Sequence, residues 1–388
     1  MTPSSGERGS YGLDVSARDD SLENTTPASA AVIVDALAAR YGGTAYAAIQ
    51  LAHRLADDRR CGEVILVTRA GSLVADGIRE RPGLQLVLLP NLRRFELVRR
   101  LVWEARALPN LIREERAASV LSWSGMLPRS VAAPVVCCIG NLVMLERGDV
   151  PNRLRRWAAR RTLREAAHVI VPSTATAARV AEVLGRDAEV IPWGVDHTEF
   201  RPAREPGADV LCVADFYRHK RQDVLLEAWA TLPAPRPRLR LIGNPEVDPR
   251  WHEEVKRQAE RFRDRGEVTL DPWLPRDQLI AAYRGARIFA LPTMHETFCL
   301  PLLEAQACGV PAVVRNSPVL RETGGQGTTY IGGDDPHEWA AALHRLLSDN
   351  AAHSAARRAG LEHARRYSWE RTAAAVRSRL ADARGSPS

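Results

Sequence analysis

The hydrophobic pattern of the chain changes near residue 30. Residues 1–29 are rich in Ser, Thr, Gly and Asp and show almost no hydrophobic periodicity, which predicts a disordered tail. From Ala30 onward, short runs of Val, Ile and Leu alternate with longer amphipathic segments, as expected for buried parallel strands joined by helices. The predicted strands of the first half are 31–37, 63–69, 84–90, 119–123, 133–139, 168–173 and 189–192. The predicted helices between them are 43–57, 94–107, 152–166 and 174–184.

The alternation pauses and restarts near the middle of the chain. The turn at 192–194 and the stretch 201–207, which contains two prolines and two arginines, predict a linker between two domains. Beyond it the predicted strands are 210–215, 239–243, 267–270, 287–292 and 311–314. The predicted helices begin near 220, cover 249–263, 276–284 and 301–308, and occupy the rest of the chain after 314. Two α/β halves of similar size are therefore predicted, each doubly wound, with ligands in the cleft at the carboxyl ends of the strands.

Composition excludes several classes of protein. The chain has 388 residues, of which 45% are hydrophobic, enough for two or three domains at about 150 residues each. No run approaches the length of a transmembrane helix, and the first twenty residues lack the apolar core of a signal peptide. The six cysteines form no CxxC pair, and most lie in apolar runs, which predicts reduced thiols in a cytoplasmic protein. The net charge of +7 favours acidic partners such as phosphates, nucleotides or anionic lipids.

The segment 295–314 predicts an anion site at the start of a helix. Pro301 suits the first helical position, where its missing N–H is not needed, and Gly309 followed by Pro311 ends the helix. The free backbone N–H groups of residues 298–302 therefore point out of the helix at the carboxyl edge of the sheet. Such a terminus suits a diphosphate.

Two acidic residues flank this helix start. Glu304 lies one turn into the helix, where its carboxylate can accept hydrogen bonds from ribose hydroxyls. Glu296 lies in the preceding loop and reaches toward whatever the diphosphate carries. Taken singly, the first reads as an ordinary complement to the helix dipole and the second as a solvated loop residue.

Two further segments indicate phosphate contacts. Gly42 and Gly43 follow a strand and open a helix, so the backbone there can approach a ligand closely; a simple tight turn is the alternative. Lys220 opens a predicted helix, where the dipole disfavours a cation, and it is one of only two lysines among 54 basic residues. A cation in that place indicates an anion to neutralise, with a solvated lysine as the alternative.

These segments together resemble the retaining family-4 glycosyltransferases. Residues 295–314 resemble the Glu-x7-Glu signature of that family, with Glu296 and Glu304 in its two acidic positions. Four more segments resemble, in the family's order, its Gly-rich loop, its hinge, its diphosphate-binding strand–loop–helix and the motif before its last helix: 41–45, 191–196, 213–229 and 367–371. The resemblance covers about residues 30–384.

The resemblance implies an α/β fold of the GT-B type, with two doubly wound Rossmann-like domains facing a central cleft. The implied parts are an acceptor-binding domain (30–196), a nucleotide-sugar domain (197–366) and a final helix (367–388) that crosses back to the first domain. The implied reaction transfers a sugar from a nucleotide diphosphate sugar to an acceptor hydroxyl with retention of anomeric configuration. No metal and no cofactor is expected beyond that co-substrate.

The resemblance also implies roles for individual residues. Lys220 would neutralise the leaving diphosphate and Glu296 would hold the transferred sugar, so these two are the predicted catalytic residues. Asn141 is the predicted acceptor-binding residue. The predicted donor-binding residues are Gly43, Arg218, Lys220, Trp273, Leu274, Thr297, Phe298, Cys299, Leu300 and Glu304.

The chain departs from the family pattern at three places. Asp215 stands where the family usually has the arginine that pairs with the diphosphate, and Arg218 is the substitute that we expect. Thr297 and Cys299 replace the two glycines of the loop before the predicted helix, which makes that turn bulkier. Gly140 stands where the family often has a histidine, so the acceptor is left undefined.

Two basic segments bear on the partners of the protein. Residues 92–107 and 153–164 predict basic amphipathic helices; peripheral contact with anionic lipid is one interpretation, but we favour ordinary surface helices. Neither segment interleaves aromatic residues as a single-strand groove would, so no nucleic-acid partner is expected.

Two competing functions share the expected fold. One is that of a GT-B nucleotide-sugar 2-epimerase, and the second is that of a nucleotide-sugar-binding protein without catalysis. For a transferase, the acceptor is expected to be a small or saccharide molecule, such as a bacterial natural product or a cell-envelope saccharide. The donor base and sugar stay open.

Overall fold

The computed structural model describes most of the chain. It covers residues 31–39, 42–79, 81–90, 96–123, 125, 127, 131–141, 150–205 and 207–385, with the backbone alone for 96–98, 150–155 and 385. The predicted tail 1–29, the Tyr41 position of the Gly-rich segment and the start of the basic segment 92–107 lie outside the described residues.

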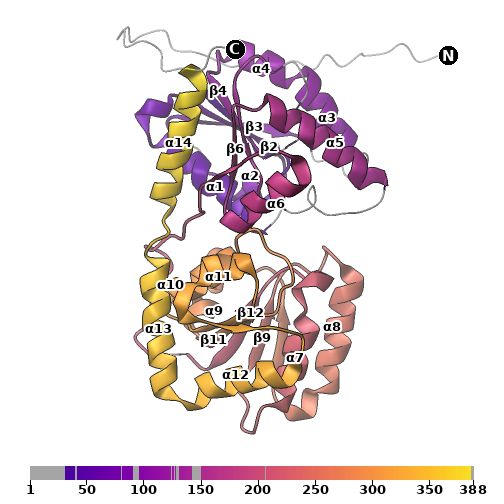
Figure 1. Ribbon diagram of the computed structural model, residues 1–388, viewed down its shortest axis with the longest axis vertical. Helices are drawn as coiled ribbons and strands as arrows, with labels where there is room; N and C mark the ends of the chain where they lie inside the picture. Colours follow the sequence, from indigo (N-terminus) through magenta and orange to yellow (C-terminus); the bar gives the residue numbers. More distant parts are fainter. Residues whose placement is uncertain are drawn as a thin grey trace, which may run out of the picture.

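The first domain is built on a parallel sheet (Figure 1). Within the described ranges its strand order is β3-β2-β1-β4-β5-β6-β7. The strands are β1 (Val32–Asp35), β2 (Val64–Arg69), β3 (Leu84–Leu89), β4 (Ser119–Ser122), β5 (Val135–Cys138), β6 (His168–Val171) and β7 (Glu189–Val190). The helices are α1 (Gly42–Ala56), α2 (Leu73–Gly77), α3 (Glu96–Arg106), α4 (Leu108–Glu114), α5 (Val150–Glu165) and α6 (Thr174–Leu184). Helices cover both faces, which is why its central strands are continuous apolar runs.

The second domain repeats the design with a smaller sheet. In the part of the chain that the structure describes, its strand order is β10-β9-β8-β11-β12-β13. The strands are β8 (Asp209–Val213), β9 (Leu239–Ile242), β10 (Val268–Asp271), β11 (Ala286–Leu291), β12 (Ala312–Arg315) and β13 (Thr328–Ile331). The helices are α7 (Gln222–Thr231), α8 (Pro249–Arg261), α9 (Arg276–Arg284), α10 (Leu300–Ala307), α11 (Pro318–Gly324), α12 (Pro336–Ser348) and α13 (Asn350–Ala364).

The prediction of helix alone after residue 314 is wrong at β13. Thr328–Ile331 pairs in parallel with β12 and forms the edge of the second sheet. The segment has only four residues between two glycines, too short to show a period of its own beside long helical segments. The short helices α2 and α4 were also missed, because neither is long enough to show an amphipathic repeat.

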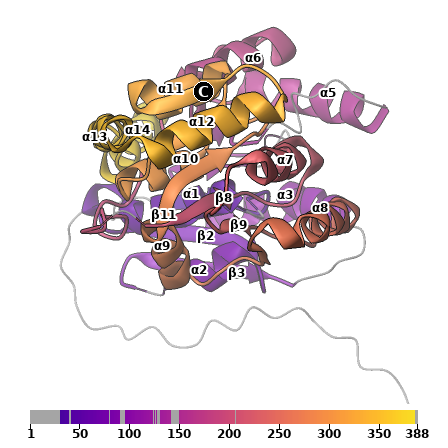
Figure 2. The ribbon, with the colours of Figure 1, turned by 90° about the horizontal axis from the view of Figure 1, so that it is seen from below.

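The last helix, α14 (Trp369–Gly385), packs on the first domain. Its side chains Ala373, Val376 and Leu380 are buried in the same apolar cluster as α1. In Figures 1 and 2, α13 and α14 run along the same side of the molecule, one beside each domain. The chain therefore crosses between the domains twice, near 190–200 and near 366–368.

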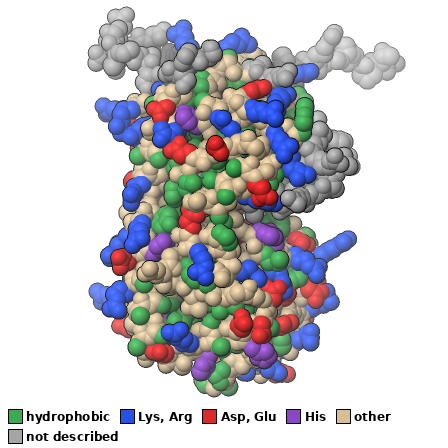
Figure 3. Space-filling model, in the orientation of Figure 1, with side chains coloured by type: hydrophobic (Ala, Val, Ile, Leu, Met, Phe, Trp, Pro, Cys, Tyr) green, Lys and Arg blue, Asp and Glu red, His purple; other side chains and the backbone are tan. Residues whose placement is uncertain are grey.

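The two basic segments form α3 and α5 on the first domain. Ala159 and Leu163 of α5 are buried against the sheet, whereas the Trp157 side chain is 61% exposed. On the face shown in Figure 3, acidic and basic side chains are interspersed over both domains. Among the described residues, no helix combines the length and the apolar character needed to span a bilayer.

Candidate active site

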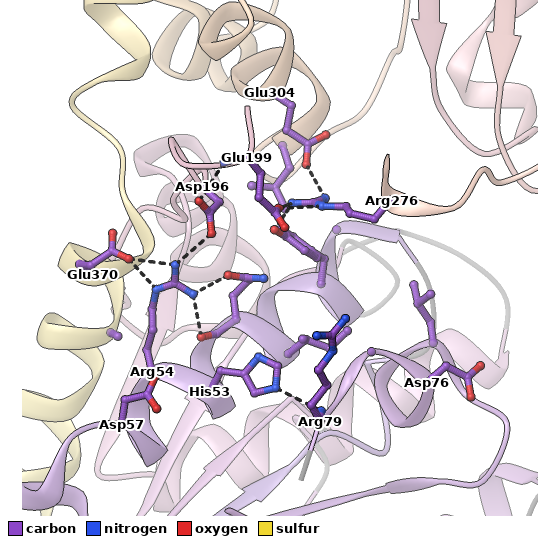
Figure 4. A pocket seen from close by; sticks show the side chains of 18 of the residues that line it. His53, Arg54, Asp57, Asp76, Arg79, Asp196, Glu199, Arg276, Glu304 and Glu370 are labelled. Atoms are coloured by element: carbon purple, nitrogen blue, oxygen red, sulfur yellow. Dashed lines mark hydrogen bonds and ion pairs between the residues drawn. The ribbon is translucent and has the colours of Figure 1, made fainter. Parts of the chain in front are cut away.

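A cavity of about 1160 Å³ lies between the two domains. It is lined by α1 and α2 of the first domain, by the linker, by the start of α9 and α10 in the second domain, and by α14 (Figure 4). The predicted donor-binding residues that line it are Gly43, Trp273, Leu274, Leu300 and Glu304. The part of the cavity at Gly42, Gly43 and Leu300 lies at the carboxyl ends of both sheets, the expected position for a ligand of two doubly wound domains; from there the cavity extends along α1 to residues 57–60.

The helix α10 begins where the sequence predicts an anion site. Its N-cap residue is Cys299, which has a left-handed backbone (φ 80°, ψ 67°), a conformation that favours glycine. Leu300 and Pro301 form the first turn and line the cavity. The bulkier turn expected from Cys299 is therefore accommodated, and the free N–H end of α10 faces the space between the domains.

The two predicted catalytic residues are paired. The Nζ atom of Lys220 lies 2.6 Å from Oε1 of Glu296, and the two side chains are 15% and 14% exposed. Burial by itself would lower the pKa of Lys220, but the carboxylate of Glu296 outweighs burial and raises it. The prediction that Lys220 opens a helix is wrong: Lys220 ends a short 3-10 turn, and α7 begins only at Gln222. Neither member of the pair lines the cavity; Glu296 belongs to the loop that leads into α10, and Lys220 lies beside that loop.

Glu304 is buried in the wall of the cavity. Its side chain is 8% exposed, and its Oε2 accepts a hydrogen bond of 2.8 Å from the hydroxyl of Tyr283. Its Oε1 lies 3.6 Å from Nη1 of Arg276. Burial raises the pKa of Glu304, and the positive charge of Arg276 and the Tyr283 hydroxyl reduce that rise without abolishing it.

Thr297 and Phe298 connect the loop before α10 to the first domain. The Thr297 hydroxyl donates to the carbonyl of Gly140 at 3.1 Å, and the Thr297 carbonyl accepts hydrogen bonds from the hydroxyls of Ser173 and Thr176 at 2.7 and 3.0 Å. The Phe298 ring packs edge-on against Trp193, with ring centroids 5.9 Å apart. These two side chains hold the loop in place at the domain junction; they do not line the cavity.

Asp215 occupies the position where the resemblance leads one to expect an arginine. Its Oδ1 accepts hydrogen bonds from the Trp273 indole at 2.7 Å and from the backbone N–H of Asn244 at 3.1 Å. Its Oδ2 faces the first domain, 3.5 Å from where a Cβ on Gly42 would lie. Burial raises the pKa of Asp215.

Arg218, the expected substitute, points elsewhere. Its guanidinium lies over the indole ring of Trp251, 5.5 Å from the ring centroid, and lines a hollow between α7 and α8. The structure therefore does not bring Arg218 together with Lys220 and Glu296 in this arrangement.

Gly140 and Asn141 follow strand β5 at the domain junction. The Gly140 carbonyl accepts hydrogen bonds from both Thr44 and Thr297. The Oδ1 atom of Asn141 is buried and finds no hydrogen-bond partner among the described residues. A buried acceptor in that state is suited to a polar ligand.

Sequence reasoning missed the residues that surround Glu304. Tyr283 and Arg276 of α9 contact Glu304 directly, and Arg276 in turn contacts Tyr46 of α1 and Glu199 of the linker. Tyr46 is one turn beyond Gly43, and Arg276 lies two residues after the predicted donor-binding residue Leu274, but neither position carries a motif. Their proximity to predicted site residues is the one signal that the sequence offers.

The chain is similar to known proteins over most of its length. Residues 41–199 match the model of Glycosyltransferase Family 4, and residues 197–363 match that of Glycosyl transferases group 1. The D-inositol 3-phosphate glycosyltransferase of Segniliparus rotundus is 32% identical over 267 residues, covering 64% of this chain and 59% of that protein. Its namesake from Thermobispora bispora is 30% identical over 254 residues, covering 59% of each. The match thus spans about three fifths of these relatives.

Solved structures show the same architecture. Sucrose-phosphate synthase from Thermosynechococcus elongatus superposes with a TM-score of 0.77 at 20% identity, covering 89% of this chain and 97% of that one. The Anabaena protein HepE in complex with UDP and glucose superposes with a TM-score of 0.75 at 15% identity, covering 90% and 99%. The predicted fold class is thereby confirmed. Because the two family models together run from residue 41 to residue 363, the chain belongs to glycosyltransferase family 4 and has the GT-B fold.

Proposed function

We propose that the protein transfers a sugar from a nucleotide diphosphate sugar to an acceptor hydroxyl, with retention at the anomeric carbon. The observation that carries this proposal is the Lys220–Glu296 pair beside the N-terminus of α10. A largely buried ammonium and a helix N-terminus together suit a leaving diphosphate, and the partner carboxylate suits sugar hydroxyls.

The proposed chemistry depends on stabilising the leaving group. The bond between the anomeric carbon and the diphosphate oxygen breaks, a bond to the acceptor oxygen forms on the same face, and the leaving phosphate takes the acceptor proton. Lys220 and the backbone N–H groups at the start of α10 stabilise the charge that develops on the diphosphate. When the donor binds, Lys220 exchanges part of its contact with Glu296 for a phosphate oxygen, which frees that carboxylate to accept hydrogen bonds from the sugar. Metal independence remains a prediction.

The donor proposal rests on the cavity. Glu304 holds the ribose, Gly43 contacts phosphate, and the segment 271–274 receives the base, largely through backbone groups. UDP is the first nucleotide to test, because HepE is described in complex with UDP and glucose.

The acceptor is proposed to be a small polyhydroxylated molecule or a saccharide that meets Asn141. The unpartnered Oδ1 atom of Asn141 supports this placement. Cyclic polyols and their phosphates enter the acceptor screen first, because relatives are named D-inositol 3-phosphate glycosyltransferase. Bacterial natural products and cell-envelope saccharides follow.

Thermal unfolding with nucleotides tests the donor site. Wild-type protein and Glu304→Ala are unfolded with UDP, GDP, ADP and dTDP in turn. A nucleotide at about 100 times its dissociation constant adds roughly 2.7 kcal/mol to the free energy of unfolding. One diphosphate should stabilise wild type clearly more than the variant; a wild-type transition that no nucleotide moves contradicts the proposal.

Acceptor dependence separates transfer from the two competing functions. A transferase releases nucleoside diphosphate faster when the acceptor is added. A 2-epimerase releases it with an altered sugar and without an acceptor, and a binding protein does not release it by catalysis.

We propose a cytoplasmic location with α5 as an ordinary surface helix. The burial of Ala159 and Leu163 supports the assignment as a surface helix, because these two apolar side chains of α5 already pack in the core of the first domain. Flotation with anionic vesicles tests it. Co-flotation that Trp157→Ala abolishes would favour peripheral membrane contact instead.

A further inference from the structure

Arg276 is the meeting point of the two domains at the cavity (Figure 4). It is the first residue of α9, and its guanidinium contacts three polar partners from three different segments. Its Nε and Nη2 atoms donate to Oε2 of Glu199 in the linker at 2.9 and 2.7 Å. Nη2 also donates to the hydroxyl of Tyr46 on α1, and Nη1 lies 3.6 Å from Oε1 of Glu304 on α10.

Two aromatic rings pack against the guanidinium of Arg276. Its central carbon lies 4.2 Å from the ring centroid of Tyr46 and 4.4 Å from that of Phe200. A planar guanidinium can stack on rings and donate in several directions at once, whereas an ammonium cannot. This position therefore suits an arginine better than a lysine.

Glu304 keeps free acceptor capacity in this arrangement. An ionised carboxylate offers about four lone-pair sites. Tyr283 occupies one site on Oε2, and Arg276 approaches Oε1 without a close hydrogen bond. Sites on both oxygens therefore remain for the two hydroxyls of a ribose.

We propose that Arg276 is a positioning residue of the donor site, which aims the carboxyl group of Glu304 at the ribose while it ties Tyr46 of the first domain to the same point. This inference rests on the function proposed above. Arg276 touches no reacting atom; it acts through Glu304 and through α1.

The electrostatics around Glu304 support the role. Burial raises the pKa of Glu304; Arg276 and the Tyr283 hydroxyl lower it, and Glu199 raises it. Because Arg276 is the largest of the opposing influences, its loss raises that pKa further. A protonated Glu304 offers the ribose fewer acceptor sites, so donor binding is then lost at a higher pH than in wild type.

The contact with Tyr46 extends the effect to the phosphate side. Tyr46 is one turn from Gly42 and Gly43, which open α1 and line the cavity. Holding Tyr46 therefore fixes the helix end that is proposed to approach the donor phosphates. One side chain thus positions both the ribose contact and the phosphate contact.

Calorimetric titration with UDP, or with whichever diphosphate best stabilises wild type, tests the proposal. It is carried out on wild type, Arg276→Gln, Arg276→Lys and Tyr46→Phe over the pH range in which each protein stays folded. Arg284→Gln is the matched control. Arg284 lies on the same helix and also donates a hydrogen bond to the linker, at the Glu199 carbonyl, but it does not line the cavity.

We expect Arg276→Gln to weaken binding by on the order of tenfold and to move the acid loss of binding to higher pH. Arg276→Lys should restore the position of that acid loss, because the charge is kept, while affinity stays reduced. Tyr46→Phe should weaken binding without moving the pH profile, and Arg284→Gln should match wild type.

The outcomes distinguish this proposal from the donor site itself. If wild type binds no nucleotide, the proposed function fails, and this inference fails with it. If wild type binds and the pH profile of Arg276→Gln coincides with that of wild type, this inference alone is overturned. Should Arg276→Gln not fold, Arg276→Lys and Tyr46→Phe decide: wild-type affinity in both overturns it.

Discussion

The ammonium of Lys220 lies 2.6 Å from the carboxylate of Glu296, although 76 residues separate them in the chain. Each lies at the carboxyl end of a strand of the second sheet, the first after β8 and the second after β11, and these two strands are neighbours. The pair thus joins the two motifs on which the functional proposal rests.

Lys220→Met should abolish most of the sugar transfer. The variant removes the cation proposed to stabilise the leaving diphosphate, so kcat should fall roughly 100- to 1000-fold. Steady-state assays with saturating donor measure this. Lys256→Met, which changes the other lysine, exposed on α8, is the matched control and should retain wild-type kcat. A Lys220→Met enzyme within a few-fold of wild type would remove Lys220 from the mechanism.

The free energy of unfolding of Asp215→Asn should exceed that of wild type by an amount that grows as pH rises. The pKa of Asp215 is raised by burial, so the folded protein holds a proton that the unfolded chain releases. As pH rises from the ordinary pKa of an aspartate to the raised pKa of Asp215, wild type therefore loses free energy of unfolding. Asn cannot ionise and so avoids that loss, and its side-chain oxygen can still accept the hydrogen bond from Trp273. Urea unfolding at a series of pH values should show an advantage of the variant that grows and then levels off. A difference that is constant with pH contradicts the assignment.

The same variant should bind nucleoside diphosphate more tightly. The Oδ2 atom faces Gly42, where the phosphates are proposed to lie, and removing a negative charge there reduces repulsion. Titration calorimetry at low and high salt measures the gain, which should shrink as salt screens the charge. Equal affinities at low salt would place the phosphates elsewhere.

Thr297→Val and Thr44→Val should show whether the hydrogen bond of Thr297 positions the loop that carries Glu296 or only stabilises the fold. Each removes one hydroxyl from the Gly140 carbonyl, so each should cost about 1 kcal/mol in the free energy of unfolding. Thr297 belongs to the loop that carries Glu296, whereas Thr44 belongs to α1. Donor KM or kcat should therefore worsen more in Thr297→Val. Identical kinetics in the two variants would show that the anchor does not serve the loop.

Gly140→Ala should destabilise the domain junction. A Cβ there would lie 2.9 Å from an atom of the Trp193 ring, which is 5% exposed and has little room to move. We expect a loss of about 1–3 kcal/mol, measured by denaturant unfolding. Gly332→Ala is the control, because its Cβ would meet nothing within 4 Å. Equal stability of the two variants would mean that Trp193 repacks freely.

Much of the architecture could be predicted from the sequence because its signals are local. Short β-branched runs between amphipathic segments identify parallel strands and their helices, as in β1 and α1. Nearby residues indicate both ends of α10: Pro301 lies in its first turn, and Gly309 comes after its last residue. For the same reason Glu304 and Glu296 could be placed beside the start of α10.

The tertiary structure decided the contacts that no local pattern records. Arg276, Tyr46 and Glu199 lie in three separate segments and meet only because the domains face each other across the cavity. Arg218 lies two residues from Lys220, yet its side chain turns to Trp251, since the 3-10 turn directs neighbouring side chains differently. Strand β13 forms because β12 offers it an edge. Local periodicity reports how one segment is solvated, but side-chain partners depend on which surfaces the folded chain brings together.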